Sequence, residues 1–183
     1  MRAFVAIDLP DAVRGEIAAL QAGLRPGRKV PEENLHLTLA FLDDLPEAIL
    51  RALHERLAEV VVAPFELRLA GLEMFGGKRP RVLYLKADAD PVLLDLHRQV
   101  RQCARDVGID LPRERFRPHV TLARFRRDML EEHMAQVGTF MAAQGTVALP
   151  PFDVAQFCLF ASTLHPDGAV HEVLAEYPTG EKE

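Results

Sequence analysis

One short motif occurs twice in this sequence, once in each half of the chain. Residues 34–42 read Asn-Leu-His-Leu-Thr-Leu-Ala-Phe-Leu, and residues 117–125 read Arg-Pro-His-Val-Thr-Leu-Ala-Arg-Phe. Both copies contain His-x-Thr-Leu-Ala within an apolar run that is too short for an ordinary helix and is bounded by polar or turn residues. Such a run is typical of a buried β-strand. The repeat therefore predicts two similar strands, one in each half of the fold.

Strand geometry assigns the side chains of each motif to two faces, because successive side chains point in opposite directions. The histidine, threonine and alanine of each motif are expected on one face: His36, Thr38 and Ala40 in the first motif, and His119, Thr121 and Ala123 in the second. The opposite face is expected to carry Leu37, Leu39 and Phe41 in the first motif, and Val120 and Leu122 in the second. Each strand would thus present an imidazole and a hydroxyl group side by side.

The rest of the hydrophobic pattern predicts further strands and four helices. Helices are expected at residues 10–24, 46–62, 91–107 and 128–142, the last one capped by Asp128. Strands are expected at residues 2–8, 35–42, 65–75, 81–87, in the second motif, and at 146–149, 152–162 and 169–175. The elements do not alternate strictly, and no linker or low-complexity tract divides residues 1–183. We therefore expect a single α+β domain with two largely antiparallel sheets and outer helices.

The order of elements is also repeated. In each half, a motif strand is followed at once by a helix that opens with proline or aspartate. This repetition indicates a bilobal domain with approximate two-fold symmetry. Such symmetry would place the two motif strands face to face across a central cleft, with His36 and His119 on opposite walls.

The charged residues are unevenly distributed. The chain has 27 acidic and 22 basic residues and a formal charge of −5, which argues against a surface that coats nucleic acid throughout. Basic residues nevertheless flank both motifs: Arg25, Arg28 and Lys29 before the first, and Arg113, Arg115, Arg117, Arg124, Arg126 and Arg127 around the second. Guanidinium groups bind phosphate bidentately, so these clusters predict a polyanionic substrate such as an RNA end. Strand parity places Arg124 opposite His119, so Arg124 reaches the cleft only if the strand bulges.

Several other classes of protein are disfavoured. Cys103 and Cys158 form no C-x-x-C pair and predict neither a disulfide framework nor a zinc site. Two strand histidines lack the further ligands that zinc requires. The apolar run at residues 3–7 is too short for a signal peptide or a membrane span. We expect a cytoplasmic protein with no cofactor, no bound metal and no membrane partner.

Two imidazoles that face two hydroxyl groups suit displacement at phosphorus. Because the unperturbed pKa of histidine is about 6.5, one ring can be neutral while the other is protonated. A general base could then take a proton from the entering oxygen while a general acid protonates the departing oxygen. The hydroxyl groups of Thr38 and Thr121 could donate hydrogen bonds to the non-bridging phosphoryl oxygens. A strained cyclic phosphodiester fits such a site without a metal ion.

These residues resemble the two-histidine (2H) phosphoesterases, and within them the bacterial and archaeal RNA 2′,3′-cyclic phosphodiesterases, historically called 2′-5′ RNA ligases. The resemblance is carried by residues 2–10, 31–42, 79–85, 116–124, 159–162 and 164–178. It implies a bilobal α+β fold and hydrolysis of a terminal 2′,3′-cyclic phosphate to a 2′-phosphate. It also implies that His36 is the proton donor, that His119 is the proton acceptor, and that Thr38, Thr121 and Arg124 bind the phosphate.

Three functions are compatible with these residues. The first is hydrolysis of cyclic phosphates on RNA 3′ ends or on cyclic nucleotides, by a protein that acts as a monomer. The second is reversible 2′-5′ joining of RNA ends, which needs the same acid and base. The third is a nucleotide- or RNA-binding module without turnover, although binding alone does not require two titrating imidazoles. His171 and the other histidines outside the motifs are expected to be structural or solvated.

Overall fold

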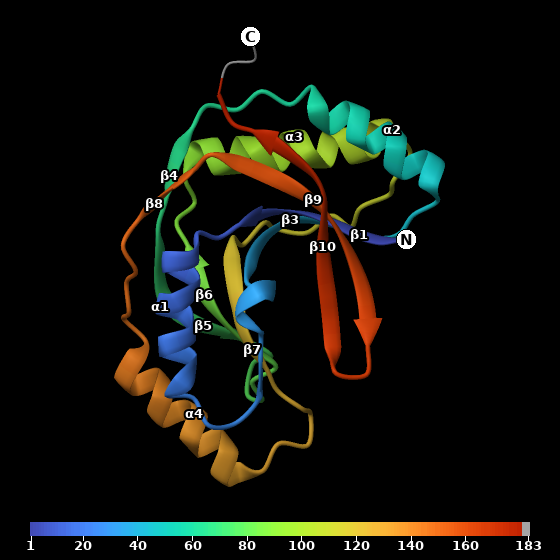
Figure 1. Ribbon diagram of the computed structural model, residues 1–183. Coiled ribbons are helices and arrows are strands. Elements are labelled where there is room, and N and C mark those ends of the chain that lie inside the picture. Colours follow the sequence, from blue (N-terminus) through green and yellow to red (C-terminus); the bar gives the residue numbers. More distant parts are fainter. Residues whose placement is uncertain (181–183) are drawn as a thin grey trace.

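The computed structural model describes residues 1–180 of the chain, and its strands and helices alternate irregularly (Figure 1). Within this range the helices are α1 (Asp11–Ala22), α2 (Glu47–Ala58), α3 (Pro91–Asp106) and α4 (Glu131–Gln144), and η1 (Glu32–Asn34) is a short 3-10 helix. The strands are β1 (Arg2–Asp8), β2 (Arg28–Lys29), β3 (His36–Asp44), β4 (Phe65–Leu67), β5 (Leu69–Phe75), β6 (Val82–Ala87), β7 (His119–Arg124), β8 (Phe152–Val154), β9 (Gln156–His165) and β10 (Gly168–Pro178). The predicted α+β class is confirmed.

A long antiparallel sheet carries both motif strands. Its strand order is β10-β9-β1-β3-β7-β6-β5, with β2 paired to β7, and a small second sheet consists of β4 and β8. The first motif lies in β3 and the second in β7, so the two copies are neighbours at the centre of the long sheet. The motif strands therefore lie side by side and hydrogen-bonded in one sheet, rather than face to face across a cleft as predicted. The β3 side of the sheet includes β9 and β10 from the end of the chain, and the β7 side includes β5 and β6 from its first half.

The two motif strands pair through Leu37 and Val120. In an antiparallel pair, one step forward on one strand corresponds to one step back on the other. This register sets His36 beside Thr121 and Thr38 beside His119. A local two-fold axis through the Leu37–Val120 pair thus relates the two copies of the motif.

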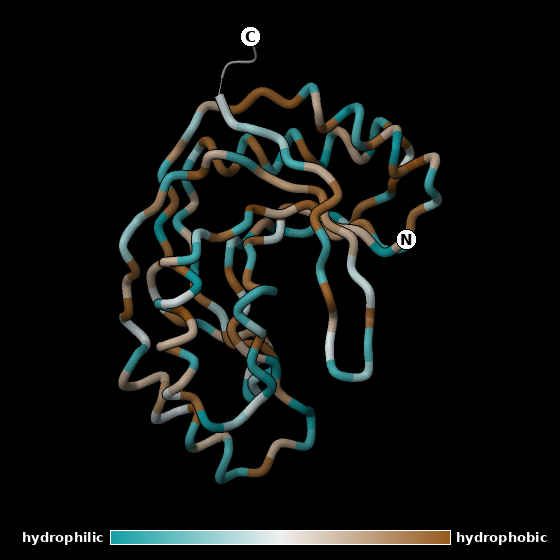
Figure 2. The backbone as a smooth tube through the Cα atoms, in the orientation of Figure 1, coloured by the Kyte–Doolittle hydropathy of each residue, from teal (hydrophilic) through white to brown (hydrophobic). Residues whose placement is uncertain are grey.

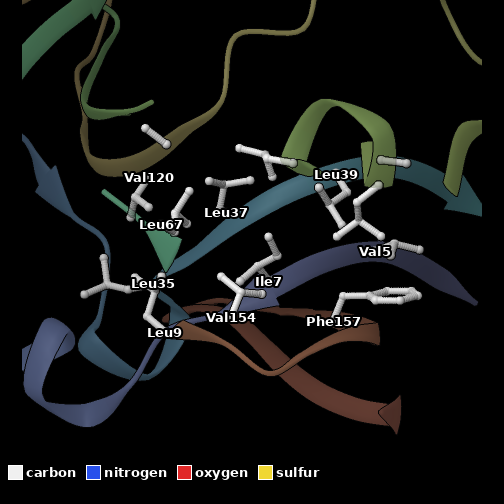
Figure 3. Close-up of a cluster of buried hydrophobic side chains, with 14 of the residues drawn as sticks. Val5, Ile7, Leu9, Leu35, Leu37, Leu39, Leu67, Val120, Val154 and Phe157 are labelled. Atoms are coloured by element: carbon white, nitrogen blue, oxygen red, sulfur yellow. The ribbon is translucent and has the colours of Figure 1, made fainter. Parts of the chain in front are cut away.

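The buried face of the motif strands forms the core of the protein. Leu37, Leu39 and Val120 are at most 2% exposed and lie with Ile7 of β1 and Phe157 of β9 in one cluster (Figure 3). Each fully buried side chain of this kind contributes about 1.5–3 kcal/mol. A slip of one residue would turn these side chains toward the cleft, so the core holds the register of both motifs.

Helix α3 shows how local sequence signals define an element. Asp90 caps it by accepting a hydrogen bond from the Val92 backbone amide at 2.7 Å, and Pro91 occupies the first position. The apolar residues at helical spacing are buried and include Leu93, Leu96, Val100 and Cys103. Figure 2 shows the corresponding alternation of hydropathy along the helices and strands. Helix α3 packs against β3 and α2, and both cysteines are free and buried.

The predicted cap of helix α4 is wrong. The helix begins at Glu131, with Leu130 at the N-cap position and no side-chain capping bond. Asp128 instead accepts a hydrogen bond from Nε of Arg126 at 3.1 Å. Asp128 thus pairs with Arg126, and residues 127–128 form a turn before the helix starts.

Three strand predictions need correction. Residues 152–162 form β8 and part of β9, because β8 pairs with β4 whereas β9 pairs with β1 and β10. Residues 65–75 form two strands, because β4 pairs with β8 whereas β5 pairs with β6. Gly71, with φ at 86°, lies at a register shift in β5 that interrupts this ladder. Residues 146–149 form a bridge at Ala148 to Ala70 rather than a strand. In residues 1–180, no helix has the length and hydropathy needed to cross a membrane.

Candidate active site

The polar face of the two motif strands lines a cleft of about 660 Å³. His36 and Thr38 of β3 form part of its wall, and His119 and Thr121 of β7 form another part. All four side chains are half-buried, while the residues between them are buried in the core. The structure therefore brings together the two imidazoles and two hydroxyl groups that the repeated motif singled out.

A β-bulge interrupts each motif strand at the same position. In β7, Thr121 pairs with Tyr84 and Ala123 pairs with the adjacent Leu83, so Leu122 is an extra residue. The pairing of β3 with β1 shows the equivalent shift, which makes Leu39 the extra residue. A bulge places two consecutive side chains on one side of a strand and reverses the parity beyond them.

Because of the bulges, the residues that follow lie on the opposite face of each strand from the predicted one. Ala40 and Ala123 do not share the face of the histidines, because they are 5% and 0% exposed and lie in the core. Phe41 and Arg124 line the cleft instead. Strand alternation predicted that Arg124 could reach the cleft only if the strand bulged, and the bulge at Leu122 brings it there.

Phe41 was assigned to the wrong face by simple alternation. It is 61% exposed and occupies the place in the first motif that Arg124 occupies in the second, five residues after the histidine. Aligning the two copies of the motif would have revealed this equivalence. The two-fold related walls therefore differ chemically, since one presents a phenyl ring where the other presents a guanidinium group.

Gln21 holds the bulge in β7. Its side chain is on α1, is 6% exposed, and donates from Nε2 to the carbonyl oxygens of Val30 and Leu122, each at 2.9 Å. The Val30 amide donates to the same Leu122 carbonyl at 2.9 Å. Because Leu122 is the extra residue, these bonds fix the backbone step that turns Arg124 toward the cleft.

Backbone carbonyl groups orient both imidazoles. Nδ1 of His36 lies 2.7 Å from the carbonyl oxygen of Asn34, and Nδ1 of His119 lies 2.6 Å from that of Arg117. A carbonyl oxygen can only accept, so each Nδ1 carries the proton and donates it in this bond. Nε2 of each ring is left available to a ligand.

Burial lowers the pKa of both motif histidines. The pKa of His36 falls to about 4, chiefly through burial, while the bond to Asn34 opposes the shift and the charges of His171, Arg14 and His119 add to it. The pKa of His119 is also lowered by burial and, less strongly, by the Arg124 guanidinium. Both rings are therefore neutral at pH 7 in the empty cleft. A bound anion would raise both pKa values because it stabilises the imidazolium form.

His171 also lies in the cleft, contrary to the expectation that it is structural or solvated. Its ring on β10 stands edge-on to that of His36, with centroids 5.4 Å apart and an interplanar angle of 86°. Phe4 of β1 packs against both rings, at 4.8 Å from His36 and 4.9 Å from His171. Sequence spacing gave no signal for this contact, because it depends on β10 folding back along β9.

Positive charge gathers around the cleft of a protein whose formal charge is −5. The charged side chains in its lining are those of Arg2, Arg28, Lys29, Arg124 and Asp43. The other arginines predicted near the second motif do not line it, and Arg126 pairs with Asp128. No group of three or more metal-ligating side chains is found among residues 1–180.

The paired His-x-Thr strands, their shared cleft and the antiparallel α+β fold define the class of two-histidine phosphoesterases. A family model described as the 2′-5′ RNA ligase superfamily matches residues 9–164. The chain belongs to this superfamily.

Curated relatives and solved structures agree with the assignment. The RNA 2′,3′-cyclic phosphodiesterase of Thermus thermophilus is 34% identical, over 97% of this chain and 89% of that protein. The enzyme of the same name from Archaeoglobus fulgidus is 29% identical, over 95% of this chain and 98% of that protein. The crystal structure of TT0787 from Thermus thermophilus aligns with a TM-score of 0.78 at 31% identity and covers 97% of each chain. E. coli LigT complexed with 3′-AMP aligns with a TM-score of 0.78 at 27% identity and covers 98% of each chain.

Proposed function

We propose that this protein hydrolyses RNA 2′,3′-cyclic phosphate ends to 2′-phosphate ends, with two histidines as acid and base. The observation that carries the proposal is the pair of adjacent motif strands, each of which presents one imidazole and one hydroxyl group to the same cleft. The names of the relatives support the activity, and the complex of E. coli LigT with 3′-AMP supports a nucleotide as ligand.

In the proposed reaction, Nε2 of His119 takes a proton from a water molecule, and the water oxygen attacks phosphorus. The bond from phosphorus to O3′ breaks, and His36 gives its proton to O3′. The products are a 2′-phosphate and a free 3′-hydroxyl group. Thr38, Thr121 and Arg124 stabilise the negative charge that develops on the non-bridging oxygens.

The two histidines suit these roles for different reasons. An imidazolium whose pKa is lowered by burial is a strong acid, which favours proton transfer from His36 to the leaving oxygen. The phosphodiester anion supplies the negative charge that lets His36 take up a proton on binding. Burial and the Arg124 guanidinium lower the pKa of His119, while its bond to the Arg117 carbonyl opposes the shift, so this ring is neutral at pH 7 and can accept a proton.

The pH dependence of kcat/KM should reflect the lowered pKa values of the free protein. The reaction needs one proton on the pair, so kcat/KM falls when both histidines are protonated and again when both are neutral. Since the pKa of His36 is about 4 and that of His119 lies below 6.5, kcat/KM should peak below pH 6.5 and decline toward pH 7. The pH optimum of kcat should lie above that of kcat/KM, because bound phosphate raises both pKa values. A kcat/KM optimum above about pH 7.5 would contradict this assignment.

The product formed from a defined RNA tests the proposed reaction itself. RNA with a 2′,3′-cyclic phosphate end, incubated with the protein in excess chelator, should yield a 2′-phosphate end at the rate seen without chelator. Loss of activity on chelation would overturn the metal-independent mechanism. A 2′-5′ linked product would favour end joining, and an unchanged cyclic end on bound RNA would favour a binding module.

Three further expectations stay predictions. The chain is proposed to form one bilobal domain over residues 1–183. Residues 181–183 of this range lie outside the described residues. It is proposed to act as a monomer. We also propose that it acts in the cytoplasm, on RNA ends or on cyclic nucleotides.

A further inference from the structure

Three basic segments meet at one end of the long sheet, beside the cleft. They are residues 25–29, residues 78–81 in the turn from β5 to β6, and residues 124–127 at the end of β7. Arg124 pairs with Arg28 on β2 and with Val82 on β6, so the three segments lie side by side. Figure 1 shows this end of the molecule opposite helices α2 and α3.

Hydrogen bonds to backbone carbonyl oxygens tie the segments together. Arg79 donates from Nη1 to the carbonyl oxygen of Arg127 at 3.2 Å. The amide of Phe125 donates to the carbonyl oxygen of Arg81 at 2.9 Å. These contacts keep the cationic side chains close together although they come from distant parts of the sequence.

The segments form a concentrated positive surface, which we call the basic rim. Its exposed members are Arg25, Arg28, Lys29, Lys78, Arg79, Arg124, Arg126 and Arg127. With half-buried Arg81, residues 25–29, 78–81 and 124–128 contain nine basic residues and one acidic residue, Asp128. Since the whole chain has a formal charge of −5, the rest of it carries −13. Such segregation of charge is typical of a surface that meets a polyanion.

Among residues 1–180, carboxylates leave most of the positive charge of the basic rim unneutralised. Asp128 pairs with Arg126, but Arg28 donates to the backbone carbonyl of Asp167 at 2.7 Å, and Arg79 also bonds to a carbonyl group. Arg28 stands directly opposite Arg124 across β2 and β7. Like charges in this position destabilise a sheet, and a phosphate group bound between them would offset the repulsion.

We infer that the basic rim binds the phosphates of the RNA strand that leads into the cleft, so that the protein acts faster on an RNA end than on a cyclic mononucleotide. This inference rests on the proposed function of the cleft. Arg28 and Arg124 line the cleft and also belong to the basic rim, so the two surfaces are continuous. A strand with its cyclic end in the cleft must leave it on the 5′ side. The rim offers that strand a path of positive charge, whereas Phe41 and Leu164 give another part of the cleft wall an apolar surface.

The test uses a variant of the rim outside the cleft and a control with the same net charge. Lys78→Gln/Arg79→Gln/Arg127→Gln removes three exposed cations that do not line the cleft. Arg51→Gln/Arg98→Gln/Arg105→Gln removes three exposed cations from α2 and α3 at the other end. The kcat/KM of each protein is measured on a 2′,3′-cyclic mononucleotide and on a single-stranded RNA of about 10 nucleotides with a cyclic end.

The rim variant should lose about tenfold in kcat/KM on the RNA at low salt and remain within about twofold of the wild type on the mononucleotide. Each neutralised phosphate of a single strand contributes about 0.7 to the slope of log affinity against log salt. For RNA, the slope of log kcat/KM against log salt should therefore become shallower by about 2 in the rim variant. The control variant should match the wild type on both substrates.

Two results would overturn the inference: equal activity of the rim variant and the wild type on RNA, or equal losses on both substrates. If the wild type hydrolyses neither the mononucleotide nor the RNA, the proposed function fails. Binding of the RNA, measured by fluorescence anisotropy, then still tests the basic rim. In that case, weaker binding by the rim variant and unchanged binding by the control would support the rim. Equal binding by all three proteins would refute it.

Discussion

Replacing His36 or His119 by alanine is expected to lower the turnover of a 2′,3′-cyclic phosphate end by about a hundred-fold or more. Each imidazole supplies one of the two proton transfers in the proposed reaction. His36 and His119 are each oriented by a backbone carbonyl, so alanine removes the reacting group without removing its neighbours. Turnover is measured with a cyclic mononucleotide, and thermal unfolding checks that the fold is intact.

His97→Ala provides a matched control. His97 lies on α3, stacks on Phe116 with ring centroids 3.7 Å apart, and does not line the cleft. The control should keep normal turnover although it also removes a partly buried imidazole. Near-normal rates in both His36→Ala and His119→Ala would exclude these side chains from the chemistry.

Replacing Arg124 by alanine is expected to lower kcat/KM by about a hundred-fold. The guanidinium group lines the cleft close enough to His119 to affect its pKa, and in the proposed reaction it stabilises the oxygens on which charge develops. Arg124→Lys should recover part of the activity, because lysine keeps the charge but cannot bind phosphate bidentately. Activity of Arg124→Ala within about threefold of the wild type would show that the guanidinium group does not contact the phosphate.

Gln21 allows a test of how Arg124 reaches the cleft. Gln21→Leu removes the two hydrogen bonds from α1 to Val30 and to the extra residue of the bulge, Leu122. We expect kcat/KM to fall about tenfold in the single variant and to show no further loss when Gln21→Leu is added to Arg124→Ala. Additive losses would mean that Gln21 acts through the general stability of the fold rather than through Arg124.

Local patterns in the sequence predicted much of the fold. Helix α3 was predicted from its capping aspartate, its first-turn proline and its apolar spacing, and each of these features has the expected place in the structure. Strands β1, β3, β6 and β7 likewise follow short apolar runs. These features depend on neighbouring residues, so the sequence displays them directly. The cap of α4 was mispredicted because Asp128 had an equally local competitor in Arg126.

Long-range contacts explain the features that pattern reasoning missed. The bulges in β3 and β7 arise from pairing with β1 and β6, which lie far away in the sequence. Strict alternation therefore assigned Phe41, Ala40 and Ala123 to the wrong faces. His171 joins the site because β10 folds back along β9, and no spacing within residues 168–178 indicates that contact.

The sequence by itself determined that two imidazoles and two hydroxyl groups would be paired on two similar strands, because alternation along a strand is a property of the local backbone. Tertiary structure decided which other groups join them. The carbonyl of Leu122 is held by Gln21, which is 101 residues away in the chain, and this contact secures the turn of Arg124 into the cleft. Burial in the assembled cleft, not the motif, lowers the pKa of His36 to about 4. The motif thus specified the reactive groups, whereas packing set their neighbours and their protonation.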